Sequence, residues 1–171
     1  MQRDDDNRGG TLCIDATSYT RWTYIDLHHH HIDTANITLG QEAPLAWDFA
    51  IHHYDVKTNN GSAAESPFDN VGMAIELNGL DFVADADSQV VIDMSTMMDG
   101  YLGYTPSMVN PVLSHWLDVD LSTMPPIYTL SNKVYLLRLN DGTLVALQFT
   151  SYMDESFVKG IVTLRYRIIN D

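Results

Sequence analysis

The chain has 171 residues, of which 45% are hydrophobic and 19% are charged. This length fits one domain with its own core, and this hydrophobic fraction excludes a wholly disordered chain. Nine Lys and Arg residues against 23 Asp and Glu residues give a net charge of −14. So acidic a chain repels phosphate backbones, which argues against nucleic acid as a partner. No apolar run approaches the roughly 20 residues that a membrane-spanning helix needs.

The N-terminal residues and the single cysteine exclude further classes. Residues 1–10 are charged and contain glycine, which predicts a flexible N-terminal segment ahead of one domain over residues 11–171. The polar start has no apolar h-region, so we expect no signal peptide within this chain. Cys13 is the one cysteine. It excludes an intramolecular disulfide framework and a zinc site built from cysteines.

Most elements predicted along the chain are strands, which indicates an all-β, mostly antiparallel domain. Only residues 112–117 have the spacing of a short helix. The sequence Asn140-Asp141-Gly142 between two apolar runs is a strong hairpin signal. Residues 94–126 form a long segment without a clear pattern, yet rich in apolar side chains, which predicts ordered functional loops. Strands are predicted over residues 19–27, 47–56, 71–77, 88–94, 133–139, 143–150 and 160–169.

Methionine is concentrated in one part of the chain. Apart from Met1 there are seven methionines, and five of them are Met94, Met97, Met98, Met108 and Met124. A single methionine usually fills a gap in a core, but cores are filled mainly from strands, and this segment is punctuated by proline and glycine. Thioether sulfur is a soft ligand that suits Cu(I) and can bind haem iron axially.

The histidines give weaker signals. Consecutive residues of a strand point to opposite faces, which argues against one tight site made by all four of His28–His31. We interpret this run as a solvated strand end or turn, and His52 and His53 as structural hydrogen-bonding groups. His115 is consistent with either kind of role. The motifs G-x-S-x-G, H-E-x-x-H, G-x-G-x-x-G and the P-loop are absent from the sequence, so we predict that the protein is not an enzyme.

Three segments taken together resemble a known family. They are IDATSYTRWTY at 14–24, WDFAIHHYDV at 47–56, and YTLSNKVY at 128–135, the last followed by Asp141-Gly142 and QFTSY at 148–152. In this order and at these separations they resemble the HmuY-type haem-binding lipoproteins, or hemophores, of Bacteroides- and Porphyromonas-like bacteria. The resemblance covers nearly all of residues 11–169.

The resemblance implies one almost all-β domain whose long loops act as fingers and grip one haem, without catalysis. It implies that haem is captured from host haemoproteins and delivered to a TonB-dependent outer-membrane receptor. It also implies an outer-membrane-anchored lipoprotein or a secreted, extracellular protein. A homo-oligomer is left open.

The family pattern also implies where the iron ligands lie. Two histidines bind iron in the family, and they would fall within residues 94–99 and 120–124, where this chain has methionines and no histidine. The resemblance therefore implies axial ligation by Met97 and Met124. Met98 and Met94 are alternative first ligands, because neighbouring residues in an extended chain face opposite ways. The pocket walls are expected to be Tyr101, Tyr104, Met108 and Trp116, since haem needs apolar and aromatic surfaces.

Two other classes remain open from the residues alone. The first is a copper-binding protein that uses the methionines and histidines. The second is a β-sandwich adhesion or glycan-binding module, for which Trp22, Trp47 and Trp116 would supply stacking surfaces.

Overall fold

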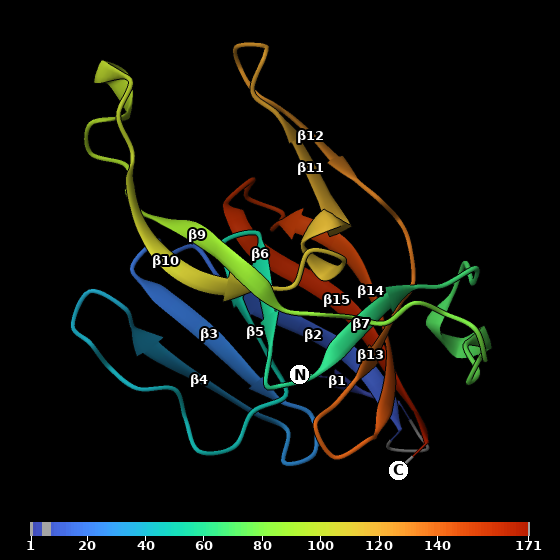
Figure 1. Cartoon of the computed structure of the whole chain (residues 1–171). Coiled ribbons are helices and arrows are strands. Elements are labelled where there is room, and N and C mark those ends of the chain that lie inside the picture. Colours follow the sequence, from blue (N-terminus) through green and yellow to red (C-terminus); the bar gives the residue numbers. More distant parts are fainter. Residues whose placement is uncertain (1, 5–7, 171) are drawn as a thin grey trace.

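The computed structural model describes residues 2–4 and 8–170 and consists mainly of β-strands (Figure 1), which confirms the predicted all-β class. Helix in these residues is limited to three short 3₁₀ turns, η1 (Val71–Met73), η2 (Met97–Asp99) and η3 (Leu113–Trp116). None of the described helices is long and apolar enough to cross a membrane. The strands are β1 (Gln2–Arg3), β2 (Gly9–Asp15), β3 (Arg21–Asp26), β4 (His31–Asn36), β5 (Phe49–His52), β6 (Asp55–Thr58), β7 (Ser62–Glu65), β8 (Val83–Ala84), β9 (Ala86–Asp93), β10 (Gly103–Val109), β11 (Leu117–Asp120), β12 (Ile127–Leu130), β13 (Tyr135–Arg138), β14 (Leu144–Met153) and β15 (Lys159–Asn170).

Two antiparallel sheets enclose the main core. One has seven strands in the order β1-β2-β15-β14-β13-β7-β8, and the other has four in the order β4-β3-β5-β6. Alternate residues of both sheets point inward, as expected for strands with one buried face. The large side chains of this core that are fully buried include Leu12, Ile14, Ile25, Phe49, Ile51, Trp116, Tyr135, Leu147 and Phe149.

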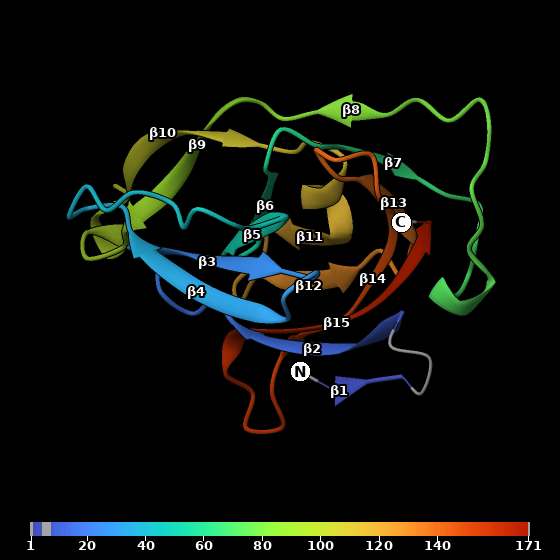
Figure 2. The ribbon, with the colours of Figure 1, turned by 90° about the horizontal axis from the view of Figure 1, so that it is seen from below.

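Two smaller hydrophobic clusters lie on the outer faces of the sheets. On the four-stranded sheet, Trp22, Tyr24 and Ala50 pack against Val90 and Val109 of the β9–β10 hairpin. Figure 2 shows the resulting order of layers, with β9–β10, then β3–β5, then β2 and β15. The outer face of the seven-stranded sheet is covered by the η1 region, with Val71 and Ala74 against Val134, Leu136, Leu144 and Ala146.

Residues 94–126 were predicted to form ordered loops without regular strands. In the structure most of them belong to two hairpins that project from one end of the molecule (Figure 1). We name the hairpin of residues 86–109 finger 1 and the hairpin of residues 117–130 finger 2. Of their four strands, only β9 overlaps a predicted strand, the one over residues 88–94. Strands β10, β11 and β12 were not predicted, because half-buried and exposed side chains alternate along them and only Val109 and Leu117 are buried. The predicted helical turn over residues 112–117 is the 3₁₀ turn η3, which lies between the fingers in sequence.

Other predicted elements differ from the structure. The single strand over residues 47–56 is a hairpin, because His53 takes a left-handed conformation (φ 54°) and turns the chain between β5 and β6. The strand over residues 71–77 is wrong: the Asn70 side chain accepts a hydrogen bond from the backbone N–H of Gly72 and starts η1 instead. Within the predicted flexible segment, β1 pairs with β2, so Gln2–Arg3 is part of the sheet. Residues 1 and 5–7 of that segment lie outside the described residues.

Candidate functional site on two fingers

The root of finger 1 is fixed to the four-stranded sheet. Strands β9 and β10 pair antiparallel from Ala86 opposite Val109 to Asp93 opposite Gly103, with an irregularity between Gly103 and Tyr104. Val90 and Val109 are buried in the outer cluster of that sheet. Ile92 packs against the same cluster, and beyond it residues 93–104 contribute no buried side chain, so they project from the body.

The tip of finger 1 is an ordered turn. The Asp93 carboxylate accepts a hydrogen bond from the backbone N–H of Ser95 (2.8 Å). The η2 turn follows, and Gly100 ends it in the left-handed conformation (φ 84°) that glycine tolerates best. The backbone N–H of Tyr101 then bonds to the carbonyl of Thr96 (3.2 Å), and the Thr96 hydroxyl bonds to the carbonyl of Tyr101 (3.1 Å). These bonds hold the segment that carries Met97 and Met98 in one shape.

Two methionines stand out at this tip. Met97 is 50% exposed and Met98 is 89% exposed, whereas Met94 is half-buried. Met97 and Met98 belong to η2, where neighbouring residues are about 120° apart and not on opposite faces. Met97 and Met98 were expected to face opposite ways because an extended chain was assumed. In this turn they do not, so their facing does not select one of them as the iron ligand.

Finger 2 repeats the pattern. Strands β11 and β12 pair from Leu117 opposite Leu130 to Asp120 opposite Ile127. The Asp120 carboxylate accepts a hydrogen bond from the backbone N–H of Ser122 (2.8 Å), as Asp93 does from Ser95 in finger 1. Met124 lies in the tip that follows and is 90% exposed, and the Met124–Pro125 peptide bond is cis. Each finger thus has an Asp-x-Ser turn at the end of its first strand and at least one exposed methionine beyond it.

The charge at the two tips is negative. Hydrogen bonds from Ser95 lower the pKa of Asp93, and hydrogen bonds from Ser122 lower the pKa of Asp120, so both are ionised at neutral pH. Residues 93–126 contain no lysine or arginine. The tips therefore offer soft, uncharged sulfur and apolar surface to a ligand, but no cationic side chain.

Exposed apolar side chains gather on the fingers. A cluster of large exposed hydrophobic groups marks a binding surface more often than a scatter of single residues does. Leu121 and Ile127 of finger 2 belong to this set, although we did not single them out from the sequence. Their position on either side of Met124 in a short hairpin is the signal that could have identified them. The complete set on the fingers is Met97, Met98, Tyr101, Tyr104, Met108, Leu121, Met124 and Ile127.

The four expected wall residues are not equivalent. Tyr101 and Tyr104 are exposed on finger 1, close in sequence to Met97. Met108 is exposed at the root of that finger, where it lines a separate cavity with Thr58, Gly61 and Asp85. Trp116 is 0% exposed and stacks on Phe149 in the main core (4.5 Å between ring centroids). The expectation that Trp116 forms a pocket wall is therefore corrected: it is too deeply buried to offer a surface.

The histidines lie away from the tips. His52 is buried and hydrogen-bonded to the carbonyl of Tyr19 (2.8 Å), and the His53 ring is hydrogen-bonded to the Tyr19 hydroxyl (2.8 Å). Both have the structural role expected from the sequence. His28 and His29 lie in the turn between β3 and β4, and His115 is exposed in η3.

Comparisons with known proteins show the family and the fold of this chain. A family model described as HmuY protein matches residues 18–166. A Bacteroides vulgatus protein of solved structure, for which an HmuY-like haem-binding role has been proposed, is 44% identical, with 100% of this chain and 97% of that chain covered and a TM-score of 0.92. A Bacteroides fragilis protein proposed to be a lipoprotein is 45% identical, with coverage of 99% and 94% and a TM-score of 0.91. The apo HmuY analogue of Tannerella forsythia shares the fold at 23% identity, with coverage of 95% and 96% and a TM-score of 0.81. No curated protein matches the chain.

Proposed function

Because this chain belongs to the HmuY family, we propose that it is a haem-binding protein that holds one haem between its two fingers. We propose further that Met97 and Met124 bind the iron, one from each finger. The proposal rests on two hairpins that project from the same end of the molecule (Figure 1). Each of them carries an exposed methionine at its tip, Met97 in finger 1 and Met124 in finger 2.

The residues present fit a haem. Haem is a large, flat, mostly apolar ligand, and the fingers carry the exposed apolar and aromatic side chains described above. Thioether sulfur is an established axial ligand of haem iron. Met97 and Met124 are exposed, so neither has to leave a packed core to reach a ligand. Met98 remains the alternative in finger 1, since it is more exposed than Met97, and Met94 is the less accessible second alternative.

The proposal gives a distinct role to each group of side chains at the finger tips. The sulfur atoms of Met97 and Met124 supply the two axial ligands. Tyr101 and Tyr104 supply aromatic faces beside the first of them. The Asp93 and Asp120 turns hold the two tips in shape. The fingers carry no lysine or arginine, so affinity comes mainly from apolar contact and sulfur ligation. Lys159 of β15, which lies over the Tyr128 ring of finger 2, is a cation beside the fingers.

A role in haem transport follows from the same proposal. We propose that the protein takes haem from host haemoproteins and delivers it to a TonB-dependent outer-membrane receptor. Its 45% identity to a protein proposed to be a lipoprotein supports a place at the cell surface. Mixing the apo-protein with methaemoglobin and following the absorbance tests the first step. Transfer of haem to the protein supports it, and an unchanged methaemoglobin spectrum would contradict it.

The direct test is a haemin titration of the wild type and single-alanine variants, read by absorbance with the iron oxidised and reduced. Met97→Ala and Met124→Ala should each weaken haem binding and change the Soret band. Met73→Ala is the matched control. Met73 is 68% exposed, but it lies in η1, which packs on the outer face of the seven-stranded sheet and not on a finger.

Each outcome of this titration decides a point. If Met98→Ala or Met94→Ala has the larger effect, the first ligand is wrongly assigned. If Met73→Ala matches Met124→Ala, methionine ligation by the tips is wrong. If the wild type gives no Soret change, the haem proposal fails, and Cu(I) or glycan binding becomes the hypothesis to test.

A further inference from the structure

A second candidate binding site lies at the end of the molecule opposite the finger tips. The turn between β3 and β4 and the turn between β13 and β14 meet there (Figure 1), around a cavity of about 420 Å³. Acidic and histidine residues make up half of its lining, and Asp26, His28, Asp48 and Asp141 are among them. None of these residues belongs to the fingers, so the proposed haem site does not explain them.

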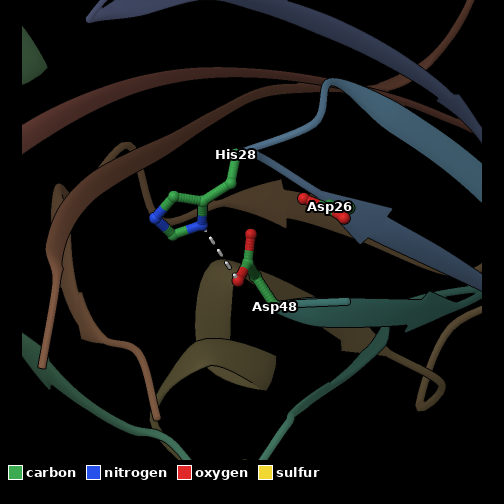
Figure 3. A group of neighbouring side chains, drawn as sticks. All are labelled: Asp26, His28 and Asp48. Atoms are coloured by element: carbon green, nitrogen blue, oxygen red, sulfur yellow. Dashed lines mark ion pairs between the residues drawn. The ribbon is translucent and has the colours of Figure 1, made fainter. Parts of the chain in front are cut away.

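Three of these side chains converge. One ligand atom from each of Asp26, His28 and Asp48 lies within 4.8 Å of the other two. The imidazole Nδ1 of His28 lies 3.7 Å from Oδ1 of Asp48, and Figure 3 shows the two side chains turned toward one another. Ligands about 2.1 Å from a zinc ion are roughly 3.4 Å apart in a tetrahedral site. Only small side-chain movements therefore separate this arrangement from a coordinating one.

The two carboxylates are buried, and the basic side chains that face them are histidines, His29 at Asp26 and His28 at Asp48. The side chains of Asp26 and Asp48 are only 8% and 13% exposed. The charged groups that face Asp48 are His28, Asp26 and Asp141, so two of the three are themselves acidic. Burial of negative charge is unfavourable unless a cation or hydrogen-bond donors compensate it. A divalent cation would compensate the Asp48 carboxylate better than the single imidazole of His28 does.

Neighbouring groups already hold the three side chains in place. Asp48 Oδ2 accepts a hydrogen bond from the backbone N–H of Leu27 (2.7 Å), which leaves Oδ1 facing His28. Asp26 is bonded to the backbone N–H and the imidazole of His29 (2.8 and 2.7 Å). The second nitrogen of His28, Nε2, lies 3.6 Å from Asp141. Histidine ligands of metals usually donate their other ring N–H to such a carboxylate, which fixes the ring and strengthens the ligand.

We infer that Asp26, His28 and Asp48 form a binding site for a divalent transition-metal ion of the zinc type, with Asp141 as the partner that orients His28. One imidazole and two carboxylates suit Zn²⁺ and its first-row neighbours. A fourth position is left for water. Asp26 ends β3, His28 lies in the turn that follows, and Asp48 directly precedes β5, so the site does not use the histidine run as a whole.

The test is isothermal titration of the metal-free protein with Zn²⁺, without haem present. We expect one bound ion per chain. His28→Asn and Asp48→Asn should each weaken binding at least tenfold, and Asp141→Asn should weaken it about 10–100-fold, as is typical for the partner of a ligand. The matched control is His31→Asn, because His31 belongs to the same run but lies at the exposed start of β4, outside the cluster. It should leave the affinity unchanged.

Three results would overturn the inference. Saturable Zn²⁺ binding could be absent from the wild type. His31→Asn could weaken binding as much as His28→Asn, which would mean that the histidine run captures the ion by itself. Asp48→Asn could leave binding unchanged. Circular dichroism identifies any variant that fails to fold, and for such a variant Asp48→Glu replaces Asp48→Asn, with weaker binding again expected. Haemin titration of the same variants should match the wild type, which keeps this test separate from that of the fingers.

Discussion

The indole N–H of Trp116 donates a hydrogen bond to the backbone carbonyl of Tyr54, with 2.9 Å between nitrogen and oxygen. Trp116 ends η3 immediately before finger 2, and Tyr54 lies in the turn between β5 and β6. The bond therefore connects the root of finger 2 to the four-stranded sheet. Stacking of Trp116 on Phe149 connects the same root to the seven-stranded sheet.

Replacement of this tryptophan should destabilise the whole domain. Trp116→Phe removes the donor, leaves the Tyr54 carbonyl without it and opens a small cavity, which together cost about 2–4 kcal/mol. Urea denaturation measures the change in the free energy of unfolding. The matched control is Trp47→Phe, which should cost less because Trp47 is only half-buried and packs outside the main core. Equal losses in the two variants would show that Trp116 is not a special anchor.

Gly160 is a second position where a small change should have a large effect. It has φ 91°, and an added Cβ would lie 2.9 Å from Thr17 Cα and 3.2 Å from the Ala16 carbonyl oxygen. The Gly160 carbonyl also accepts a hydrogen bond from the backbone N–H of Ala16 (2.9 Å). This bond ties β15 to the residue after β2, so the backbone cannot easily move apart to make room for a new Cβ. Gly79→Ala is the control, since Gly79 has φ 83° but no atom within 4 Å of the new Cβ. Gly160→Ala should cost about 1–3 kcal/mol more than the control in thermal or urea unfolding.

Stability should fall in mild acid because of His53. Burial is the main cause that lowers the pKa of His53 to about 4, from 6.5 in the unfolded chain. Between these two values the unfolded chain binds more protons than the folded one, so the free energy of unfolding decreases as pH falls from about 6.5 towards 4. After allowance for the partial exposure of His53, the expected loss from this residue is about 1–2 kcal/mol.

His53→Asn isolates this contribution. Asparagine tolerates the left-handed backbone at this position (φ 54°) but does not titrate. Urea denaturation at pH 7 and pH 4.5 should show that the stability difference between wild type and variant shrinks in acid. A difference that stays constant with pH would contradict the assignment to His53.

Ligation by methionine predicts a preference for reduced haem. Thioether is soft and uncharged, so it favours ferrous over ferric iron relative to imidazole and raises the reduction potential. Dissociation constants measured with and without dithionite should therefore be lower for the reduced form. Tighter binding of ferric haem would count against two methionine ligands. Met124→His is a useful comparison, because an imidazole at this tip should shift the preference towards the ferric form.

Much of the body of the fold could be predicted from local sequence. The Asn140-Asp141-Gly142 turn joins β13 to β14 as expected, and Gly142 takes the required positive φ (92°). The strand predicted over residues 160–169 matches β15, and the strand predicted over residues 88–94 matches most of β9, the first strand of finger 1. These segments were predictable because either their turn chemistry or their apolar pattern is local.

The rest of the fingers, beyond β9, and the His28 cluster could not be predicted in the same way. Tyr104 and Met108 lie in a strand that is exposed in alternate positions, so its hydrophobic groups resemble loop residues. Asp48 is 20 positions from His28, and only the pairing of β5 with β3 brings the two together. The buried position of Trp116 was equally invisible, because an aromatic residue in a core and one at a binding surface look alike in the sequence.

The separate roots of the fingers have a consequence for the rate at which a ligand leaves. Finger 1 is fixed to an outer cluster, whereas finger 2 begins in the main core, and no strand pairing joins the two. Each finger is a two-stranded hairpin, which is marginally stable beyond its root. We therefore expect that either finger can open alone, and that a ligand bound as proposed, by both fingers, is released when the weaker finger opens. Dissociation should follow the opening rate of the more mobile hairpin and be insensitive to the stability of the body.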